Sequence, residues 1–275
     1  MEPEEVGAVR VADDEDFKAF RRLADGAEGW CKKYDKNGIK VWLQNSSDTE
    51  SDNSRIRLIK VHKTLHDVSA ATTYDVLHDA AYRKKWDRTM VEGFELCKVN
   101  WTNDISYYQM KCPPPLRNRD FVMQRTWLET GKEYIIFNHS IFHKKIPPRK
   151  GVIRGHSYLT GYLVRPKGSN ACEITYVTRS DPKGSIPSWA INRLAHILAP
   201  KVVDRLHQAC RDYPKWKSKH EPRYKPWLYP EQISLPPLDP SDLLSKEECI
   251  SDNSLDETEI KEEDLQDSNF QDGDF

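Results

Sequence analysis

The sequence predicts an α+β domain in which a curved antiparallel β-sheet packs around one long amphipathic helix near the C-terminus. Two observations lead to this prediction. Between residues 107 and 178, short apolar stretches are separated by Pro, Gly and Asn turns, as in a run of antiparallel strands. From Ser188 onward the apolar residues recur every three or four positions instead, which is the period of a helix.

The elements that precede this region are shorter. A first helix is expected after Asp13 or Asp14, since Phe17, Phe20 and Leu23 recur at helical spacing. Asn37-Gly38 is typical of a tight turn, and strands are expected at 39–43 and 55–63. Residues 67–88 show a helical stripe that Asp67 could cap, in two short helical segments.

The β-rich region continues with five stretches of strand character. In the last of them, Cys172, Ile174, Tyr176 and Thr178 fall on one face, which is the period of two expected for a half-buried strand. Strands this close in sequence favour an antiparallel meander. The five stretches are 107–110, 121–127, 134–141, 152–164 and 172–178.

The last helix is expected to span 188–212, longer than average. Pro200 lies inside it and removes one backbone donor. Its apolar stripe could form a movable lid over the sheet or an ordinary static core helix, and spacing alone leaves both open. The stripe consists of Ile191, Leu194, Leu198, Val202, Leu206 and Ala209.

The net charge differs strongly between the two ends of the chain and its middle. Residues 239–275 carry a net charge of -12 and residues 1–16 a net charge of -6, so the remaining body must hold +17 to reach the total of -1. We therefore predict an acidic disordered N-terminus at 1–16, a folded domain at 17–217, a proline-rich exit segment at 218–238 and an acidic disordered tail at 239–275. A basic body favours an anionic partner such as a membrane surface.

Other classes of protein find little support. No secretion signal and no apolar run of membrane-spanning length is present, so any membrane contact is expected to be peripheral. No common catalytic motif, no histidine cluster with metal-ligand spacing and no nucleic-acid-binding motif is found. The sequence therefore predicts neither an enzyme nor a metalloprotein, although nucleic-acid binding and an enzyme of related fold remain the rival hypotheses.

The densest candidate site is Tyr82-Arg83-Lys84-Lys85-Trp86-Asp87. Arg83 and Asp87 are four residues apart, so on a helix they share a face and can pair. An ordinary solvated ion pair is the simpler interpretation of this spacing. Alternatively, Arg83 points inward as a phosphate ligand, with Asp87 as its partner when no ligand is bound.

Four segments together resemble the START domain family, in its phosphatidylcholine transfer protein subgroup. They are Tyr-Arg-Lys-Lys-Trp-Asp at 82–87, Asn-Arg-Asp-Phe at 118–121, Gly-Val-Ile-Arg at 151–154 and Asp-Pro-Lys-Gly-Ser-Ile-Pro-Ser-Trp at 181–189. They occur in family order, and the resemblance covers about residues 17–217. The segment Lys-Pro-Trp-Leu-Tyr-Pro-Glu-Gln at 225–232 also resembles the exit segment of one family member.

The resemblance implies a helix-grip fold that encloses a tunnel for one lipid. It implies a cytoplasmic phospholipid transfer protein that acts peripherally at membranes, with no cofactor besides its lipid cargo. A lipid sensor or adaptor that binds lipid without bulk transfer is the alternative. The residues implied to line the tunnel from the lid helix are Trp189, Ile191, Leu194, Leu198 and Val202.

The headgroup site implied by the resemblance comprises Arg83, Asp87, Tyr108, Phe121 and Tyr158. In the choline-specific relative, an aromatic cage holds the quaternary ammonium. Tyr158 keeps its cage position here, but Tyr108 replaces Trp, Phe121 replaces Tyr, and Leu77 replaces another Tyr. The expected cargo is therefore phosphatidylcholine or phosphatidylethanolamine.

The acidic tail contains two candidate phosphorylation sites. Ser245 and Ser254 are each followed by an acid three residues on, a pattern that acidophilic kinases select. Phosphate at either site would make the tail more negative and should weaken docking on anionic membranes. Equal membrane binding by the full-length and the tail-deleted protein would contradict this control.

Overall fold

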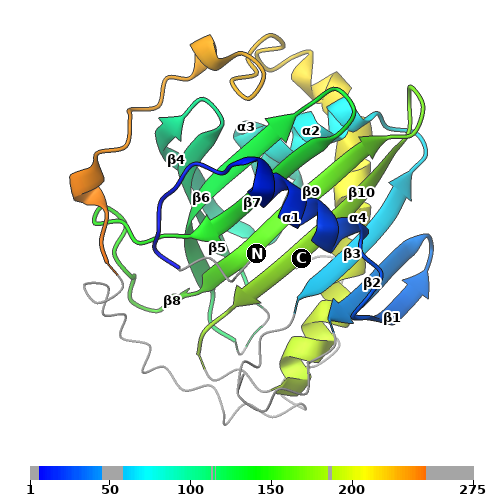
Figure 1. Ribbon diagram of the computed structural model, residues 1–275, viewed down its shortest axis with the longest axis horizontal. Helices are drawn as coiled ribbons and strands as arrows, with labels where there is room; N and C mark the ends of the chain where they lie inside the picture. Colours follow the sequence, from blue (N-terminus) through cyan, green and yellow to red (C-terminus); the bar gives the residue numbers. More distant parts are fainter. Residues whose placement is uncertain (1–5, 45–57, 113, 115, 185–187, 246–275) are drawn as a thin grey trace.

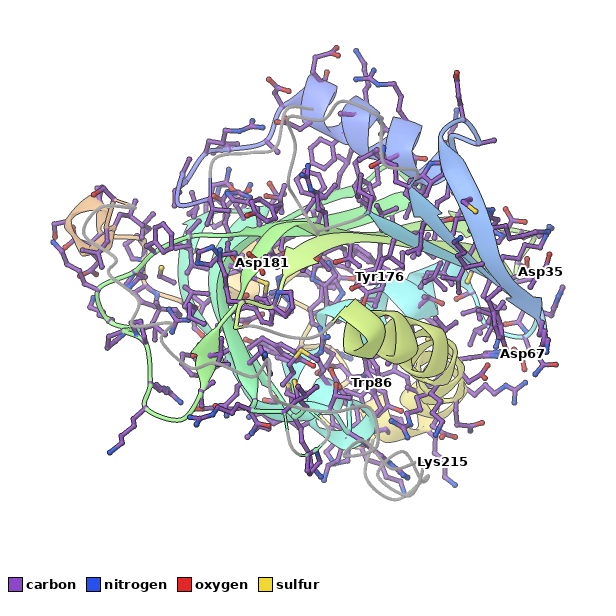
Figure 2. All side chains as sticks on the ribbon, turned by 90° about the horizontal axis from the view of Figure 1, so that it is seen from below. Asp35, Asp67, Trp86, Tyr176, Asp181 and Lys215 are labelled. Atoms are coloured by element: carbon purple, nitrogen blue, oxygen red, sulfur yellow. The ribbon has the colours of Figure 1, made fainter. Side chains whose placement is uncertain are left out.

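The computed structural model describes residues 6–44, 58–112, 114, 116–184 and 188–245, the last range without the side chains of 188–200. One curved sheet forms the centre of the molecule, with α1 on its outer face and the other helices on its inner face (Figures 1 and 2). The predicted α+β architecture, with a sheet gripping a C-terminal helix, is confirmed.

The sheet has the strand order β1-β2-β3-β10-β9-β7-β6-β5-β4, with the short β8 paired parallel to β6. All other pairs are antiparallel, and β3 joins β10 across more than a hundred residues of sequence. The strands are β1 (Trp30–Lys36), β2 (Ile39–Gln44), β3 (Ile59–Leu65), β4 (Met90–Asn100), β5 (Asn103–Met110), β6 (Arg119–Glu129), β7 (Tyr134–Ser140), β8 (Ile153–Arg154), β9 (His156–Pro166) and β10 (Cys172–Asp181).

The helices are α1 (Asp14–Asp25), α2 (Ala70–His78), α3 (Ala80–Trp86) and α4 (Ser188–Lys217), with short 3-10 turns η1 (Pro230–Gln232) and η2 (Pro240–Asp242). Asp13 caps α1 as predicted, in a capping box with Asp16. Ser69, and not the predicted Asp67, caps α2. Asp67 instead forms ion pairs with His207 and Arg211 of α4.

The inner face of the sheet carries the main core against α2 and α4. Tyr74 and Leu77 of α2 pack there with Trp127, and with Leu206 and Tyr213 of α4. Helix α4 extends five residues beyond its predicted end. Its described C-terminal half is held at several points: the Tyr82 hydroxyl donates to the carbonyl of Ala209, and Asp79 pairs with Lys217.

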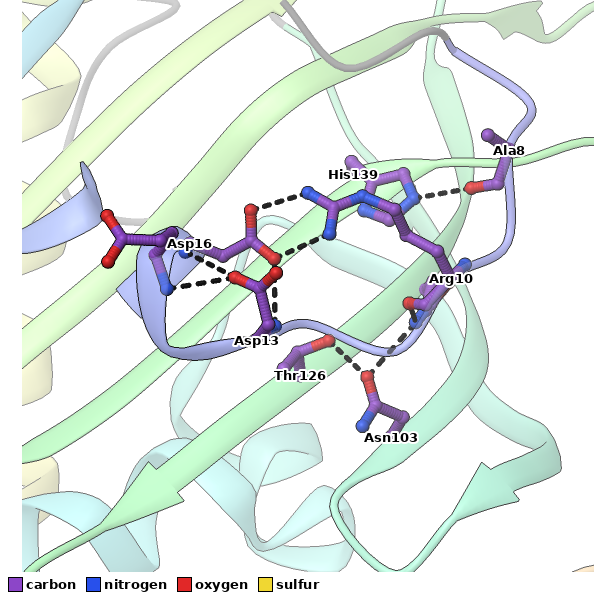
Figure 3. A network of polar contacts seen from close by, with 9 residues as sticks. Ala8, Arg10, Asp13, Asp16, Asn103, Thr126 and His139 are labelled. Atoms are coloured by element: carbon purple, nitrogen blue, oxygen red, sulfur yellow. Dashed lines mark hydrogen bonds and ion pairs between the residues drawn. The ribbon is translucent and has the colours of Figure 1, made fainter. Parts of the chain in front are cut away.

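The N-terminal segment, residues 6–13, lies across the outer face of β5, β6 and β7 (Figure 3). The buried side-chain amide of Gln124 exchanges two hydrogen bonds with the backbone of Arg10 and donates a third to Asn103. His139 contacts the carbonyl of Ala8 at 2.8 Å. Residues 6–13 thus make specific contacts with the sheet, and the predicted domain boundary at position 17 stays a prediction.

Residues 218–245 form a segment that we call the C-terminal strap, which wraps around the β4 edge of the sheet (Figure 1). Asp75 of α2 accepts hydrogen bonds from Lys225 and from the indole of Trp227. Further along, the backbone of Lys98 on β4 bonds to Pro236 and Leu238. The strap thus continues past position 239 through η2, and the predicted start of the tail there stays a prediction.

Candidate functional site

Arg83 and Asp87 form the centre of the candidate site. Arg83 lies in the second turn of α3, and its Nε donates to the Asp87 carboxylate at 3.0 Å. Asp87 also accepts from the hydroxyls of Thr89 and Tyr108, at 2.6 and 3.1 Å. The predicted pair therefore exists, and three neighbouring donors hold the Asp87 carboxylate in place.

The Arg83 guanidinium is enclosed but keeps accessible surface. Its side chain is 31% exposed, whereas Asp87 is 8% exposed. Burial alone would lower the pKa of Arg83, but Asp87, Tyr108 and Tyr162 outweigh it and raise that pKa. Burial acts to raise the pKa of Asp87, but Arg83 and the hydrogen bonds from Thr89 and Tyr108 together more than offset it, so that pKa is lowered. Both groups are therefore charged at neutral pH.

Aromatic rings surround this pair. The Arg83 guanidinium lies 5.1 Å from the Tyr108 ring centroid and 5.7 Å from that of Trp86. Tyr162 and Tyr176 face the same space from β9 and β10, with their ring centroids 4.9 Å apart. Figure 2 shows Tyr176 and Trp86 in the region between the sheet and the helices. Burial raises the pKa of Tyr108, Tyr162 and Tyr176, so their hydroxyls stay neutral donors.

The accessible surface of these side chains faces the inside of the molecule. Arg83, Tyr108, Tyr162 and Tyr176 are all partly exposed even though protein surrounds each of them. Accessible surface on side chains so enclosed indicates an internal space between the inner face of the sheet and the helices. One cation with aromatic walls in such a space is suited to an anionic group attached to an apolar body.

Residues 10–217 match the START domain family. The chain belongs to this family. It is 44% identical over 255 residues to START domain-containing protein 10 of Mus musculus, and the matched residues make up 93% of this chain and 86% of that protein. It is 32% identical over 217 residues to phosphatidylcholine transfer protein of Mus musculus, with 76% of this chain and 98% of that protein covered. The crystal structure of human STARD10 matches with a TM-score of 0.80 and 45% identity, over 86% of this chain and 95% of that one.

The other two predicted headgroup residues of the START domain, Phe121 and Tyr158, have different neighbours. Phe121 lies directly opposite Tyr108 in the pairing of β5 and β6. Tyr158, in contrast, has its ring under the guanidinium of Arg179, 5.5 Å away. The register of β9 and β10 jumps from Leu159–Arg179 to Ser157–Ser180, which leaves Tyr158 as the extra residue of a bulge. Its direction therefore cannot be counted from its neighbours, and its place in the headgroup site stays a prediction.

Sequence reasoning missed two aromatic residues of this site. Tyr162 and Tyr176 both interact electrostatically with Arg83. The sequence pattern singles out only Tyr176, and only as part of a strand face. The two are direct cross-strand partners in the pairing of β9 and β10. A signal was available in the alternation of both strands, but their register, which places the two rings together, is not visible in the sequence.

The predicted lid residues lie mostly outside the described side chains. Trp189, Ile191, Leu194 and Leu198 belong to the part of α4 for which only the backbone is described. Val202 is 36% exposed, whereas Val203 is buried against Val61 of β3. Val203, rather than Val202, thus faces the sheet at this turn, whereas Leu206 and Ala209 of the predicted stripe are buried in the core.

A second charged cluster lies on the inner face. Arg125 of β6 pairs with Asp104 of β5 and Glu95 of β4, and its guanidinium lies 5.4 Å from the Trp127 ring centroid. Burial raises the pKa of Asp104, an effect that Arg125 opposes. Since two carboxylates face one guanidinium, this cluster has no positive charge left to attract an anion.

A hydroxyl-rich patch covers the inner wall of β9 and β10. Its members bond to one another at 2.7 to 3.4 Å. They can donate to or accept from an uncharged polar group such as an ester. The patch comprises Asn138, Ser157, Thr160, Thr178 and Ser180.

Neither a metal site nor a membrane-spanning helix is found in the described ranges. No group of three or more His, Cys, Asp or Glu side chains there is arranged to hold a metal ion. None of the helices in that part of the chain combines the length and apolar character that a bilayer crossing requires. Of the two candidate phosphorylation sites, Ser245 is the last described residue, and Ser254 lies outside the description.

Proposed function

We propose that this protein carries one phosphatidylcholine or phosphatidylethanolamine molecule between membranes in the space beneath α4. The observation that carries the proposal is the enclosed Arg83, whose single counter-ion and aromatic surroundings suit a lipid phosphate. Membership of the START domain family and the likeness to phosphatidylcholine transfer protein support it. Arg83 binds the phosphate, and Asp87 positions Arg83.

Enclosure of the acyl chains is the energetic requirement for such transfer. A two-chain phospholipid in water would expose about 30 methylene groups, at about 0.8 kcal/mol each, or roughly 25 kcal/mol in total. A shallow surface groove could not offset this cost. The internal space between sheet and helices offers the enclosure, and the hydroxyl patch on β9 and β10 offers partners for the ester groups.

The headgroup preference follows from the incomplete cage. Since Leu77 is aliphatic and buried in the core, fewer rings surround a quaternary ammonium than in a complete cage. Losing part of a cation–π cage removes about 1 kcal/mol, which is roughly a fivefold change in affinity. Both choline and ethanolamine headgroups are therefore accommodated.

A vesicle transfer assay tests the proposal. We expect the full-length protein to move labelled phosphatidylcholine and phosphatidylethanolamine from donor to acceptor vesicles at rates within about tenfold of each other. Native mass spectrometry of the same sample should show one phospholipid per chain. Transfer of choline lipids alone would contradict the headgroup assignment, and a bound lipid without transfer above background would favour a lipid sensor or adaptor instead.

Exchange of the lipid requires an opening, which we assign to the N-terminal half of α4. The C-terminal half is anchored by Asp79, Asp67 and the ion pair of Lys63 with Asp204, so movement there would break several polar contacts, including the buried pair of Asp79 with Lys217. The basic body docks on an anionic membrane, and the helix loosens ahead of Val203. The docked protein remains at the membrane surface throughout.

Hydrogen exchange measures this opening. Anionic vesicles should speed amide exchange at residues 188–200 by about tenfold or more, while residues 203–217 keep their protection. Neutral vesicles are the matched control and should have a smaller effect, because docking relies on the basic body. Equal exchange in both halves of α4, with and without vesicles, would contradict a gate in this helix.

A further inference from the structure

A pocket of about 320 Å³ lies on the outer face of the sheet, on the opposite side from Arg83. It is bounded by the end of α1, the segment after it, and strands β1, β2, β3, β9 and β10. Its volume is at the lower end of the range for ligand pockets, about 300–1,000 Å³, and fits a molecule with a single ring. Its walls include two indoles, Trp30 and Trp42, and two lysines, Lys40 and Lys60.

Lys60 is the unusual group in this pocket. It is 5% exposed, and its ammonium donates to the backbone carbonyls of Gly26 and Leu23 at the end of α1. The same nitrogen lies 4.3 Å from the Trp30 ring centroid and 5.5 Å from that of Trp42. In the described part of the chain, Lys60 forms no ion pair with a carboxylate. Burial lowers the pKa of Lys60, and the nearby Asp25 carboxylate opposes this shift only in part.

The other charges of the pocket are compensated, with one exception. Arg165 binds Asp25 through both of its terminal nitrogens and also pairs with Glu133. Glu173 pairs with Lys167. Lys40 is exposed at the mouth of the pocket and forms no ion pair within the described ranges.

Strand register brings the uncompensated cations together. Lys40 and Trp42 lie two residues apart on one face of β2, and Trp42 is directly opposite Lys60 on β3. Lys40 is thus the diagonal cross-strand neighbour of Lys60, within reach of a shared ligand. His62, opposite Lys40, contacts Thr175 at 3.1 Å, and burial lowers its pKa, so it adds no positive charge at neutral pH.

We propose that this outer pocket binds a small organic anion, a carboxylate or phosphate carried on a flat ring, with the anion between Lys40 and Lys60 and the ring against Trp42. Such a ligand supplies the missing counter-charge to Lys60. Its ring takes the stacking surface that two indoles provide. The site is separated from the lipid site by the thickness of the sheet, so the ligand binds whether or not a lipid is present.

Titration of the full-length protein by NMR tests the proposal. Benzoate and phenyl phosphate are the probes, and benzamide and benzamidine are matched neutral and cationic controls. We expect saturable shifts of the indole N–H signals of Trp30 and Trp42 with the two anions, and shifts at least fivefold weaker with the controls. Lys40→Gln should weaken anion binding about tenfold or more, since a charged hydrogen bond is lost.

Three further variants make the outcome decisive. Lys84→Gln, at an exposed position of α3 on the other side of the sheet, and Arg83→Met, in the lipid site, should leave the binding of the anions unchanged. Trp42→Leu should weaken it without removing either cation. The proposal is overturned if neither anion gives a saturable shift, if benzamide binds as well as benzoate, or if Lys40→Gln binds both anions like the unchanged protein.

Discussion

Replacement of Arg83 by Met is expected to reduce phospholipid transfer by about 100-fold. The variant would lack the charged hydrogen bonds that the guanidinium donates to the lipid phosphate, each of which contributes about 1.5–3 kcal/mol. It would also leave the Asp87 carboxylate, 8% exposed, next to an anionic phosphate. Transfer between vesicles, followed with a fluorescent phospholipid, measures the effect.

Variants on the same helix separate binding from folding. Lys84 neighbours Arg83 but is exposed, so Lys84→Met should change transfer less than twofold. Arg83→Lys keeps the charge but loses the planar donor geometry and should fall between the two. Near-normal transfer by a folded Arg83→Met protein would remove Arg83 from the site, and a lower melting temperature in the double variant Arg83→Met/Asp87→Asn would point to a structural role.

Asp79→Ala is expected to destabilise the protein by about 3–5 kcal/mol, the usual cost of removing one partner of a buried ion pair. Asp79 is 4% exposed and accepts from Lys217 at 2.8 Å and from the Tyr213 hydroxyl at 3.0 Å. It also caps α3 through the backbone of Tyr82. For a domain of this size the melting temperature should fall by about 10 °C in calorimetry.

The control uses an ion pair of the same type at the surface. Asp25 is paired with Arg165, but both side chains are at least a third exposed, so Asp25→Ala should cost less than about 1 kcal/mol. Replacing both buried partners, in Asp79→Ala/Lys217→Met, should recover part of the loss because no charge is left uncompensated. Equal melting temperatures for Asp79→Ala and Asp25→Ala would show that the buried pair does not anchor α4.

Local signals in the sequence predicted most of the elements but missed two strands. The capping residue of α1, the Asn37-Gly38 turn and the start of α4 depend on neighbouring residues alone, and all three are confirmed. Strands β1 and β4 were missed because they form the two edges of the sheet. Most of their residues are only partly buried, so apolar and polar side chains do not alternate clearly along them.

The candidate site also combines features that local sequence predicts with features that it does not. The pairing of Arg83 with Asp87 follows from helical spacing, and the sequence predicted it. Tyr162 and Tyr176 join this pair only through the register of two strands, and a bulge sets the direction of Tyr158. Neither feature has a local signal, because register is set by side chains that are distant in sequence.

The pairing of β3 with β10 has a consequence for how the protein folds. Strand β3 ends at Leu65 and its partner begins at Cys172, so the two halves of the sheet join only after roughly 100 further residues have been synthesised. At about 5–20 residues per second, this takes roughly 5–20 s. During that interval one edge of β3, which carries Val61 and Leu65, has no neighbour within the sheet. Contacts of such high sequence separation make folding slow, and they leave the nascent chain open to association through this strand until β10 emerges.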